Sequence, residues 1–183
     1  SDVDPSAGGP AGGKNGFRNR RWILRCALMK LCRFLAPGAP APAIGLTLDD
    51  QHVLDLSAVG VAHLTDLLDQ PDLPLHLASR AAQKPRQFAL AAVRLLSPVE
   101  QQEVWAAGVT YLRSKRARME ESDFSATAYD RVYDAPRPEI FFKSLGPKVV
   151  TSGDAVGIRS DAKWNVPEPE LALVLNRRGQ LVG

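Results

Sequence analysis

Two carboxylates stand two residues apart near the end of the chain, in residues 164–174, which read WNVPEPELALV. If this segment is a strand, the side chains of Glu168 and Glu170 project to the same face, where they repel each other. A hard divalent cation such as Mg²⁺ or Mn²⁺ would relieve the repulsion, because both ions prefer oxygen ligands. The alternative is a solvated sheet edge, which Pro167 and Pro169 favour because neither can donate a hydrogen bond to a ladder.

Further candidate residues stand earlier in the chain. Glu139 precedes and Lys143 follows the apolar residues 140–142, which predict a strand. Glu139 could act as an acid or a base at the head of this strand. The ammonium of Lys143 could lie against an anion at its end, or the side chain could lie along the surface with its charge in water. Tyr111 opens a basic run in which Arg113 could bind a carboxylate.

The elements that must position these residues follow from the pattern of apolar and turn residues. Before residue 99 the pattern predicts a small α+β unit with a hairpin, short helices and strands. Its expected strands cover residues 30–35, 43–48, 52–56 and 89–96, and its expected helices cover residues 61–68 and 75–82.

A second, mostly β unit is expected from residue 99 onward. It begins with a strand over residues 103–109, in which Gly108 marks a point of close approach, and continues with a charged helix over 112–122. Further extended pieces are expected at 140–142, twice within 147–158, and at 168–175, followed by a turn at 176–179 and a partner strand. Because the chain ends soon after this turn, we expect the second domain to be incomplete.

Composition narrows the class of protein. The 183 residues carry a net charge of +3, but residues 1–33 carry +5 and residues 34–183 carry −2. The body of the chain therefore offers no overall attraction to nucleic acid. No run of 18 apolar residues occurs, so no membrane span is predicted. The two cysteines, Cys26 and Cys32, form no disulfide framework, which favours a cytoplasmic location.

The first 28 residues differ from the rest of the chain. They begin with a Gly- and Pro-rich tail and continue as a basic, partly apolar stretch. Such a composition cannot repay the entropy of ordering, so we expect a disordered leader that does not pack on the domains. Met29 is a plausible native start, and residues 1–28 are then not native.

Four motifs of the second unit together resemble the fumarylacetoacetate hydrolase family. PEPELALVLNRRG is similar to the family's E-x-E-L-A-x-V metal motif, and AAGVTYLRSKRARMEES to its G-x-N-Y-x-x-H-x-x-E stretch. PEIFFKSLGPKVV resembles its P-x-x-F-x-K segment, and SGDAVGIRSD the short strands before the metal motif. The four occur in the family's order over residues 99–183. The resemblance implies that residues 29–98 form the variable N-terminal domain and that residues 99–183 begin the mixed β-roll catalytic domain.

The resemblance also implies a cofactor, a substrate class and an assembly. Glu168 and Glu170 would be two ligands of Mg²⁺ or Mn²⁺, while the family's aspartate ligand falls beyond Gly183. The metal would chelate the 2-oxo-carboxylate of a small-molecule substrate and serve as an electron sink. The full-length protein would be a homodimer, with no nucleic-acid or membrane partner.

One departure from the family's pattern bears on the reaction. Hydrolases of the family place a histidine three residues after the motif tyrosine, and a glutamate three further on, to activate water. Here Ser114 and Ala117 stand at these positions after Tyr111. The motif therefore looks more like the branch that contains 2-keto-3-deoxy-D-arabinonate dehydratase. With Glu139 and Lys143 as catalytic residues, Tyr111, Arg113 and Ser114 would bind the substrate.

Three functions remain open at this point. The first is a metal-dependent lyase that dehydrates a 2-oxo sugar acid, such as a 2-keto-3-deoxy-aldonate. The second is a hydrolase or isomerase of the same family that acts on acylpyruvates or related diketo acids. The third is an inactive fragment or a binding module that uses the basic leader. We expect the chain as given to bind divalent cations weakly and to be inactive, and an extended version to act as a dehydratase.

Overall fold

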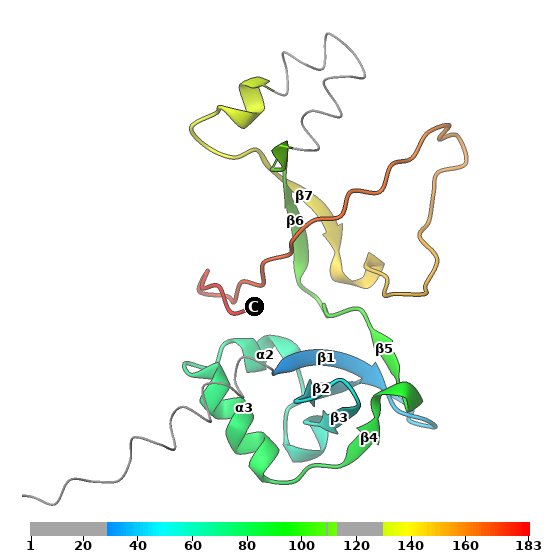
Figure 1. Ribbon diagram of the computed structural model, residues 1–183, viewed down its shortest axis with the longest axis vertical. Helices are drawn as coiled ribbons and strands as arrows, with labels where there is room; N and C mark the ends of the chain where they lie inside the picture. Colours follow the sequence, from blue (N-terminus) through cyan, green and yellow to red (C-terminus); the bar gives the residue numbers. More distant parts are fainter. Residues whose placement is uncertain (1–28, 109, 113–129) are drawn as a thin grey trace, which may run out of the picture.

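The computed structural model describes residues 29–108, 110–112 and 130–183 (Figure 1). In this part of the chain strands outnumber helices, so the predicted α+β class with a predominance of β is confirmed at that level. The family's β-roll is not established by these elements. The predicted leader, residues 1–28, lies outside the described residues.

The first unit is built on a five-stranded antiparallel sheet. Its spatial order is β4-β3-β2-β1-β5. The strands are β1 (Lys30–Leu35), β2 (Ala43–Thr47), β3 (His52–Asp55), β4 (Gln87–Ala89) and β5 (Arg94–Leu96). The predicted strand at 30–35 and the hairpin that follows it are both confirmed.

An aspartate closes the hairpin between β2 and β3. One carboxylate oxygen of Asp49 accepts hydrogen bonds from the backbone N–H groups of Gln51 and His52, at 2.9 and 2.7 Å. An Asx turn of this kind satisfies backbone donors that the ladder leaves unpaired. The sequence signal for a turn at this position therefore had a local physical basis.

The expected strand over residues 89–96 is a correction, because it is two short strands with a 3₁₀ helix, η2 (Leu90–Ala92), between them. β4 pairs with β3 at one edge of the sheet, and β5 pairs with β1 at the other edge. A single continuous strand cannot pair at both edges, so the chain has to break and turn between them. This is a tertiary constraint that the apolar run does not reveal.

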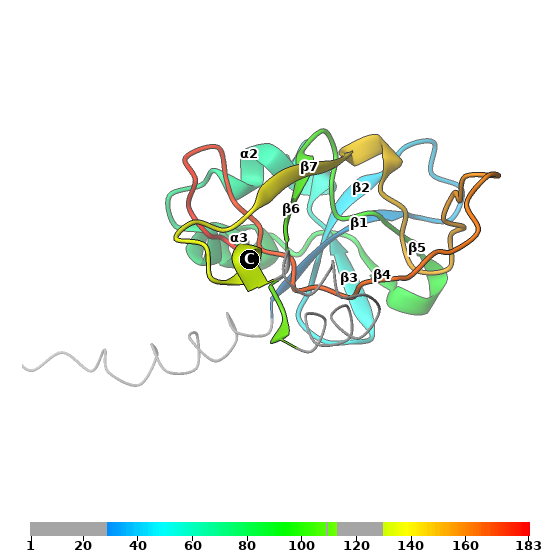
Figure 2. The same ribbon diagram turned by 90° about the horizontal axis from the view of Figure 1, so that it is seen from above.

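Two helices cover one side of the sheet in both views of the molecule (Figures 1 and 2). They are α2 (Leu64–Leu68) and α3 (Leu73–Ala82), and a 3₁₀ helix, η1 (Ser57–Val59), precedes them. Asp72 caps α3 by accepting a hydrogen bond from the N–H of Leu75 at 3.1 Å. Both helices predicted from the sequence are present, with α2 shorter than expected.

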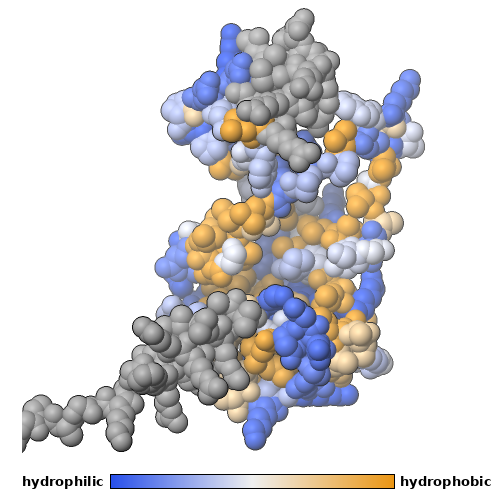
Figure 3. All heavy atoms as spheres, viewed as in Figure 1, coloured by the Kyte–Doolittle hydropathy of each residue, from blue (hydrophilic) through white to orange (hydrophobic). Residues whose placement is uncertain are grey.

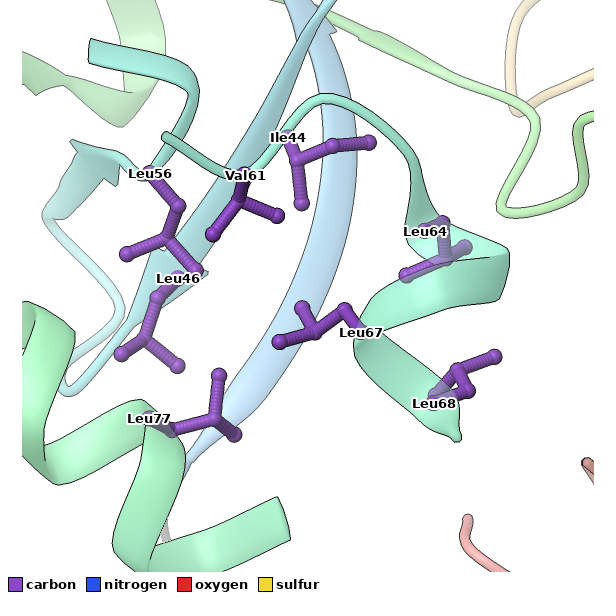
Figure 4. Close-up of a cluster of buried hydrophobic side chains, with 8 residues drawn as sticks. All are labelled: Ile44, Leu46, Leu56, Val61, Leu64, Leu67, Leu68 and Leu77. Atoms are coloured by element: carbon purple, nitrogen blue, oxygen red, sulfur yellow. The ribbon is translucent and has the colours of Figure 1, made fainter. Parts of the chain in front are cut away.

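The core lies between these helices and the sheet (Figure 4). The cluster on this side of the sheet is aliphatic, while Phe34, which is fully buried, packs edge to face on Phe88. Burial of each such side chain stabilises the fold by about 1.5–3 kcal/mol. Its buried members are Ile44, Leu46, Leu56, Val61, Leu64, Leu67, Leu68 and Leu77.

The linker between the two units is packed rather than free. The carboxylate of Glu100 accepts a hydrogen bond from the first N–H of α2, that of Leu64, at 2.8 Å. Gln102 donates its side-chain amide to the hydroxyl of Thr65 at 2.9 Å. A side chain at Gly146 would place its Cβ 2.5 Å from the carbonyl oxygen of Glu100. These contacts fix the start of the second unit against α2.

The second unit has one antiparallel pair, β6 (Glu103–Ala107) and β7 (Ile140–Leu145), followed by the 3₁₀ helix η3 (Gly146–Lys148). The register shifts between Val104 and Trp105, where β7 carries one extra residue, Lys143. The rings of Trp105 and Phe142 meet edge to face, with centroids 6.0 Å apart. Both predicted strands are confirmed, whereas the predicted helix over 112–122 lies almost wholly outside the described residues.

The expected strand over residues 168–175 is the main correction. In the described C-terminal segment these residues form no strand, and pairing is limited to a bridge between Leu175 and Leu181. The extended pieces expected within 147–158 are likewise not strands. Strands need a neighbour for their backbone groups, and residues 149–173 run as a loop that leaves η3 and returns towards β6 (Figure 1). The prolines at 167 and 169 also remove two donors from this segment.

A short hairpin at the end of the chain packs on α2. Asn176 begins its turn, as predicted, and is 9% exposed. The guanidinium of Arg177 binds the carboxylates of Asp66, at 3.1 Å, and Asp69. The side chain of Arg178 donates a hydrogen bond to the carbonyl of Asp69 at 3.0 Å. These contacts anchor the end of the 149–173 loop to the first unit.

Large apolar side chains remain at the surface, mostly in the second unit (Figure 3). Trp105 is 57% exposed, Ile140 is 60% exposed and Leu171 is 79% exposed. Among the described helices, none is long and apolar enough to cross a membrane.

Candidate functional site

Two candidate residues, Gly108 and Glu139, meet where β6 ends and β7 begins. Gly108 directly follows β6, and its N–H donates to the carbonyl of Glu139 at 2.8 Å. A Cβ on Gly108 would lie 2.4 Å from a carboxylate oxygen of Glu139. The close approach predicted at this glycine is therefore confirmed, because the absence of a side chain leaves room for the Glu139 carboxylate.

Glu139 and Lys143 stand at different points of β7. Glu139 directly precedes the strand, whereas Lys143 is the extra residue at the register shift, since Ser144 pairs with Val104 and Phe142 pairs with Trp105. A bulge interrupts the alternation of side chains along a strand, so spacing alone does not place the two side chains on one face. The Lys143 side chain lies along the strand, with its Nζ 5.7 Å from the centroid of the Phe141 ring.

Tyr111 connects this strand pair to the Glu168–Glu170 segment. Its hydroxyl accepts a hydrogen bond of 2.8 Å from the backbone N–H of Leu171. The two residues are 60 positions apart in the sequence, so the contact depends on the path of the long loop. The segment with both glutamates therefore passes beside Tyr111, three residues after Gly108. Arg113 and Ser114, the other predicted substrate-binding residues, lie outside the described residues.

Glu168 and Glu170 are exposed, and they stand on a loop rather than on the predicted strand. Two carboxylates supply the hard oxygen donors that Mg²⁺ and Mn²⁺ require, so the donor set fits such an ion in kind. It does not fit in number. Among the described residues, no three His, Cys, Asp or Glu side chains lie close enough together to hold a metal ion. The assignment of Glu168 and Glu170 as ligands therefore stays a prediction.

The candidate site is open. Glu139, Lys143, Glu168 and Glu170 are all exposed, and Tyr111 is 40% exposed. A groove of about 700 Å³ does exist between α2, α3 and the C-terminal hairpin, but none of the candidate residues lines it. Its walls are mainly aliphatic. The groove is thus separate from the residues that could do chemistry.

Sequence reasoning missed two features around the site. The first is the hydrogen bond that the Tyr111 hydroxyl accepts from Leu171, which no local sequence pattern indicates. The second is the docking of Asn176 and Arg177 on α2, where the sequence pattern indicated only the turn. The acidic residues of α2 and the basic turn were visible separately, but nothing in the sequence paired them.

The chain is related to dehydratases of 2-keto-3-deoxy sugar acids. Over 86 residues it is 56% identical to a protein of Haloferax volcanii named "Probable 2-keto-3-deoxyxylonate dehydratase", a match that covers 47% of this chain and 29% of that protein. Over 101 residues it is 40% identical to the 2-dehydro-3-deoxy-D-arabinonate dehydratase of Saccharolobus solfataricus, covering 54% of this chain and 34% of that protein. The chain thus matches about a third of the length of these curated relatives.

Within the matched part, these relatives confirm the dehydratase branch to which the sequence resemblance pointed. No family model matches the chain. No solved structure matches it significantly either.

Proposed function

We propose that the chain belongs to a divalent-metal-dependent dehydratase that acts on a 2-oxo sugar acid such as a 2-keto-3-deoxy-aldonate. The observation that carries the proposal is the similarity, at 56% and 40% identity, to two proteins named as dehydratases of such acids. Ser114, which replaces the water-activating histidine of the hydrolases, supports elimination over hydrolysis.

Glu168 and Glu170 would supply carboxylate ligands to Mg²⁺ or Mn²⁺. When bound, the ion would polarise the 2-oxo-carboxylate and make the hydrogens on the neighbouring carbon more acidic. The proposal assigns two ligands to this chain because its described residues bring no third acidic or imidazole side chain to the pair.

The remaining candidates would handle the proton and the substrate's charge. Dehydration removes a proton from the carbon beside the 2-oxo group and a hydroxyl from the next carbon. In this proposal Glu139 takes or returns a proton at these positions, since its carboxylate lies beside Gly108 on the open face. The ammonium of Lys143, in the same strand, neutralises the negative charge of the substrate. Tyr111, Arg113 and Ser114 bind the polar end of the substrate.

We propose that the protein is a cytoplasmic homodimer. The dimer is supported by the open candidate site together with the exposed apolar side chains of β6 and β7, such as Trp105 and Ile140. A second subunit would cover such a surface and exclude water from the chemistry. Light scattering coupled to size exclusion tests this, and a monomer at micromolar concentration would contradict it.

The test of the proposed function combines metal binding with turnover. Isothermal titration with Mn²⁺ should give binding that Glu168→Gln and Glu170→Gln each weaken strongly. In the protein with any residues that its gene encodes after Gly183, Glu139→Gln should leave Mn²⁺ binding intact and lower the dehydration of a 2-keto-3-deoxy-pentonate by about 10²-fold or more.

Glu103→Gln is the matched control, because Glu103 is also on this strand pair but its carboxylate accepts a hydrogen bond from the indole of Trp105. It should change neither property. Mn²⁺ binding that survives both metal-segment variants, or turnover that survives Glu139→Gln, would contradict the assignment of these residues.

A further inference from the structure

Tyr111 makes one contact that substrate binding does not explain. Its hydroxyl oxygen accepts a hydrogen bond of 2.8 Å from the N–H of Leu171, the residue directly after Glu170. The bond joins the end of β6 to a loop 60 residues later in the chain. Leu171 is itself 79% exposed, so its side chain does not hold the loop in place.

Sheet pairing does not fix the backbone around the two glutamates. Residues 168–173 take part in no sheet ladder, although the structure describes all of them. Pro167 and Pro169 have no N–H to donate. The peptide group between Glu170 and Leu171 does donate, and it donates to Tyr111. This bond restrains the peptide group between Glu170 and Leu171. It thereby restricts the ψ torsion of Glu170, on which the direction of the Glu170 side chain depends.

We propose that Tyr111 is a positioning residue that holds the Glu168–Glu170 segment in place for its ligand. The proposal rests on the proposed function, in which the segment binds a divalent cation. A phenol has one hydrogen to donate and two acceptor positions. The bond from Leu171 uses one acceptor position, so the hydroxyl hydrogen stays available for the substrate. Tyr111 can therefore fix the metal segment and bind substrate at the same time.

The decisive variant is Tyr111→Phe, which keeps the ring and removes the acceptor. Leu171→Ala is the matched control, because it keeps the N–H donor and removes only an exposed side chain. Two readouts are needed: the exchange rate of the Leu171 amide with solvent, by NMR of ¹⁵N-leucine-labelled protein without metal, and the affinity for Mn²⁺ by titration. The Mn²⁺ electron paramagnetic resonance line shape reports the order of the bound ion.

In Tyr111→Phe we expect the Leu171 amide to exchange about 2- to 10-fold faster, which is the loss of one hydrogen bond. We expect the Mn²⁺ affinity to fall by a similar factor and the bound-ion spectrum to broaden, while the thermal unfolding midpoint stays the same. For the control, exchange is read at the alanine amide in uniformly labelled protein, and all properties should stay near those of the parent.

Unchanged Leu171 exchange in Tyr111→Phe would overturn the proposal. So would a loss of Mn²⁺ affinity as large in Leu171→Ala as in Tyr111→Phe. If the parent protein binds no Mn²⁺ at all, the metal assignment of the proposed function fails by itself. The exchange comparison then still decides whether Tyr111 fixes the segment.

Discussion

Asn176→Ala should release the C-terminal hairpin from the first unit. In the native protein Oδ1 of Asn176 accepts hydrogen bonds from the N–H groups of Arg178 and Gln180, both at 3.0 Å. Its Nδ2 donates to the side chain of Gln180 at 2.9 Å and to the carbonyl of Leu68 at 3.5 Å. Alanine keeps none of these bonds and leaves the carbonyl at the end of α2 without this partner.

The three shorter bonds lie within the turn, and this turn presents Arg177 to Asp66 and Asp69. Their loss loosens the turn and therefore sets the size of the effect on docking. A hydrogen bond contributes about 0.5–1.5 kcal/mol net, and water reaches the partly exposed partners in the variant. We therefore expect the docked hairpin to lose about 2 kcal/mol, which corresponds to a roughly 30-fold larger open population.

Trypsin measures that opening, because Arg177 and Arg178 lie within the docked turn. When opening and closing are fast relative to cleavage, the cleavage rate follows the open population. Cleavage at these arginines should thus accelerate by roughly 30-fold in Asn176→Ala. A peptide of residues 171–183, with and without the substitution, corrects for the change in the sequence at the cut.

Asn165→Ala is the matched control, since Asn165 is exposed in the preceding loop. Its cleavage rate at the two arginines should stay within about twofold of the parent. If Asn176→Ala leaves the rate unchanged, or if Asn165→Ala raises it as much, the hairpin does not dock through Asn176 and the reasoning is refuted.

Three further predictions concern the first unit and its contact with the hairpin. Gly45→Ala places a methyl group 2.5 Å from Val53 and 2.7 Å from the sulfur of Cys32, so it should cost about 3 kcal/mol of unfolding free energy in urea. Gly157→Ala, which meets nothing within 4 Å, should cost less than about 0.5 kcal/mol, and equal costs would contradict the packing. Burial raises the pKa of the Cys32 thiol to about 11. In a variant without the other cysteine, roughly one thiol in a thousand is ionised at pH 8 and alkylation should be slow; labelling at the rate of a free thiol would show that the site is open. The hydrogen bond from Arg177 lowers the pKa of Asp69. The stabilisation by this ion pair is therefore complete above the ordinary carboxyl pKa of about 4 and is lost as the pH falls through the lowered value. Protection of the docked hairpin, measured with an acid-active protease, should weaken only below about pH 4; weakening already near pH 6 would point to another group.

The elements of the first unit were predictable because their signals are local. The hairpin between β2 and β3 has a turn residue, Asp49, whose side chain makes the turn bonds itself. β1 is an apolar run stopped by a Pro-Gly pair, and α3 carries its cap at Asp72. In each case the residues that define the element lie within the element or next to it.

The failures arose where a neighbour decides the structure. Whether residues 89–96 form one strand or two depends on which edges of the sheet they meet, and they meet opposite edges. Residues 168–175 have the apolar side chains of a strand, but strand formation needs a partner that the described residues do not provide. The sequence pattern reports the potential to pair, not the presence of a pair.

The candidate residues could be named from the sequence, but their contacts could not. Glu168 and Glu170 followed from spacing, and Gly108 followed from its place at the end of an apolar strand. The bond between Tyr111 and Leu171 crosses 60 residues and involves a backbone group, which carries no residue-type signal. Such contacts appear only once the path of the loop is known.

The central claim is that this chain belongs to a dehydratase and not to a hydrolase, and a direct comparison of the two reactions tests it. The protein, with any residues that its gene encodes after Gly183, is assayed with Mg²⁺ against a 2-keto-3-deoxy-pentonate and against an acylpyruvate. We predict loss of one water from the sugar acid, detected by mass spectrometry, at a rate well above the release of pyruvate. Faster release of pyruvate from the acylpyruvate than dehydration of any sugar acid would contradict the account and show that Ser114 does not mark the branch.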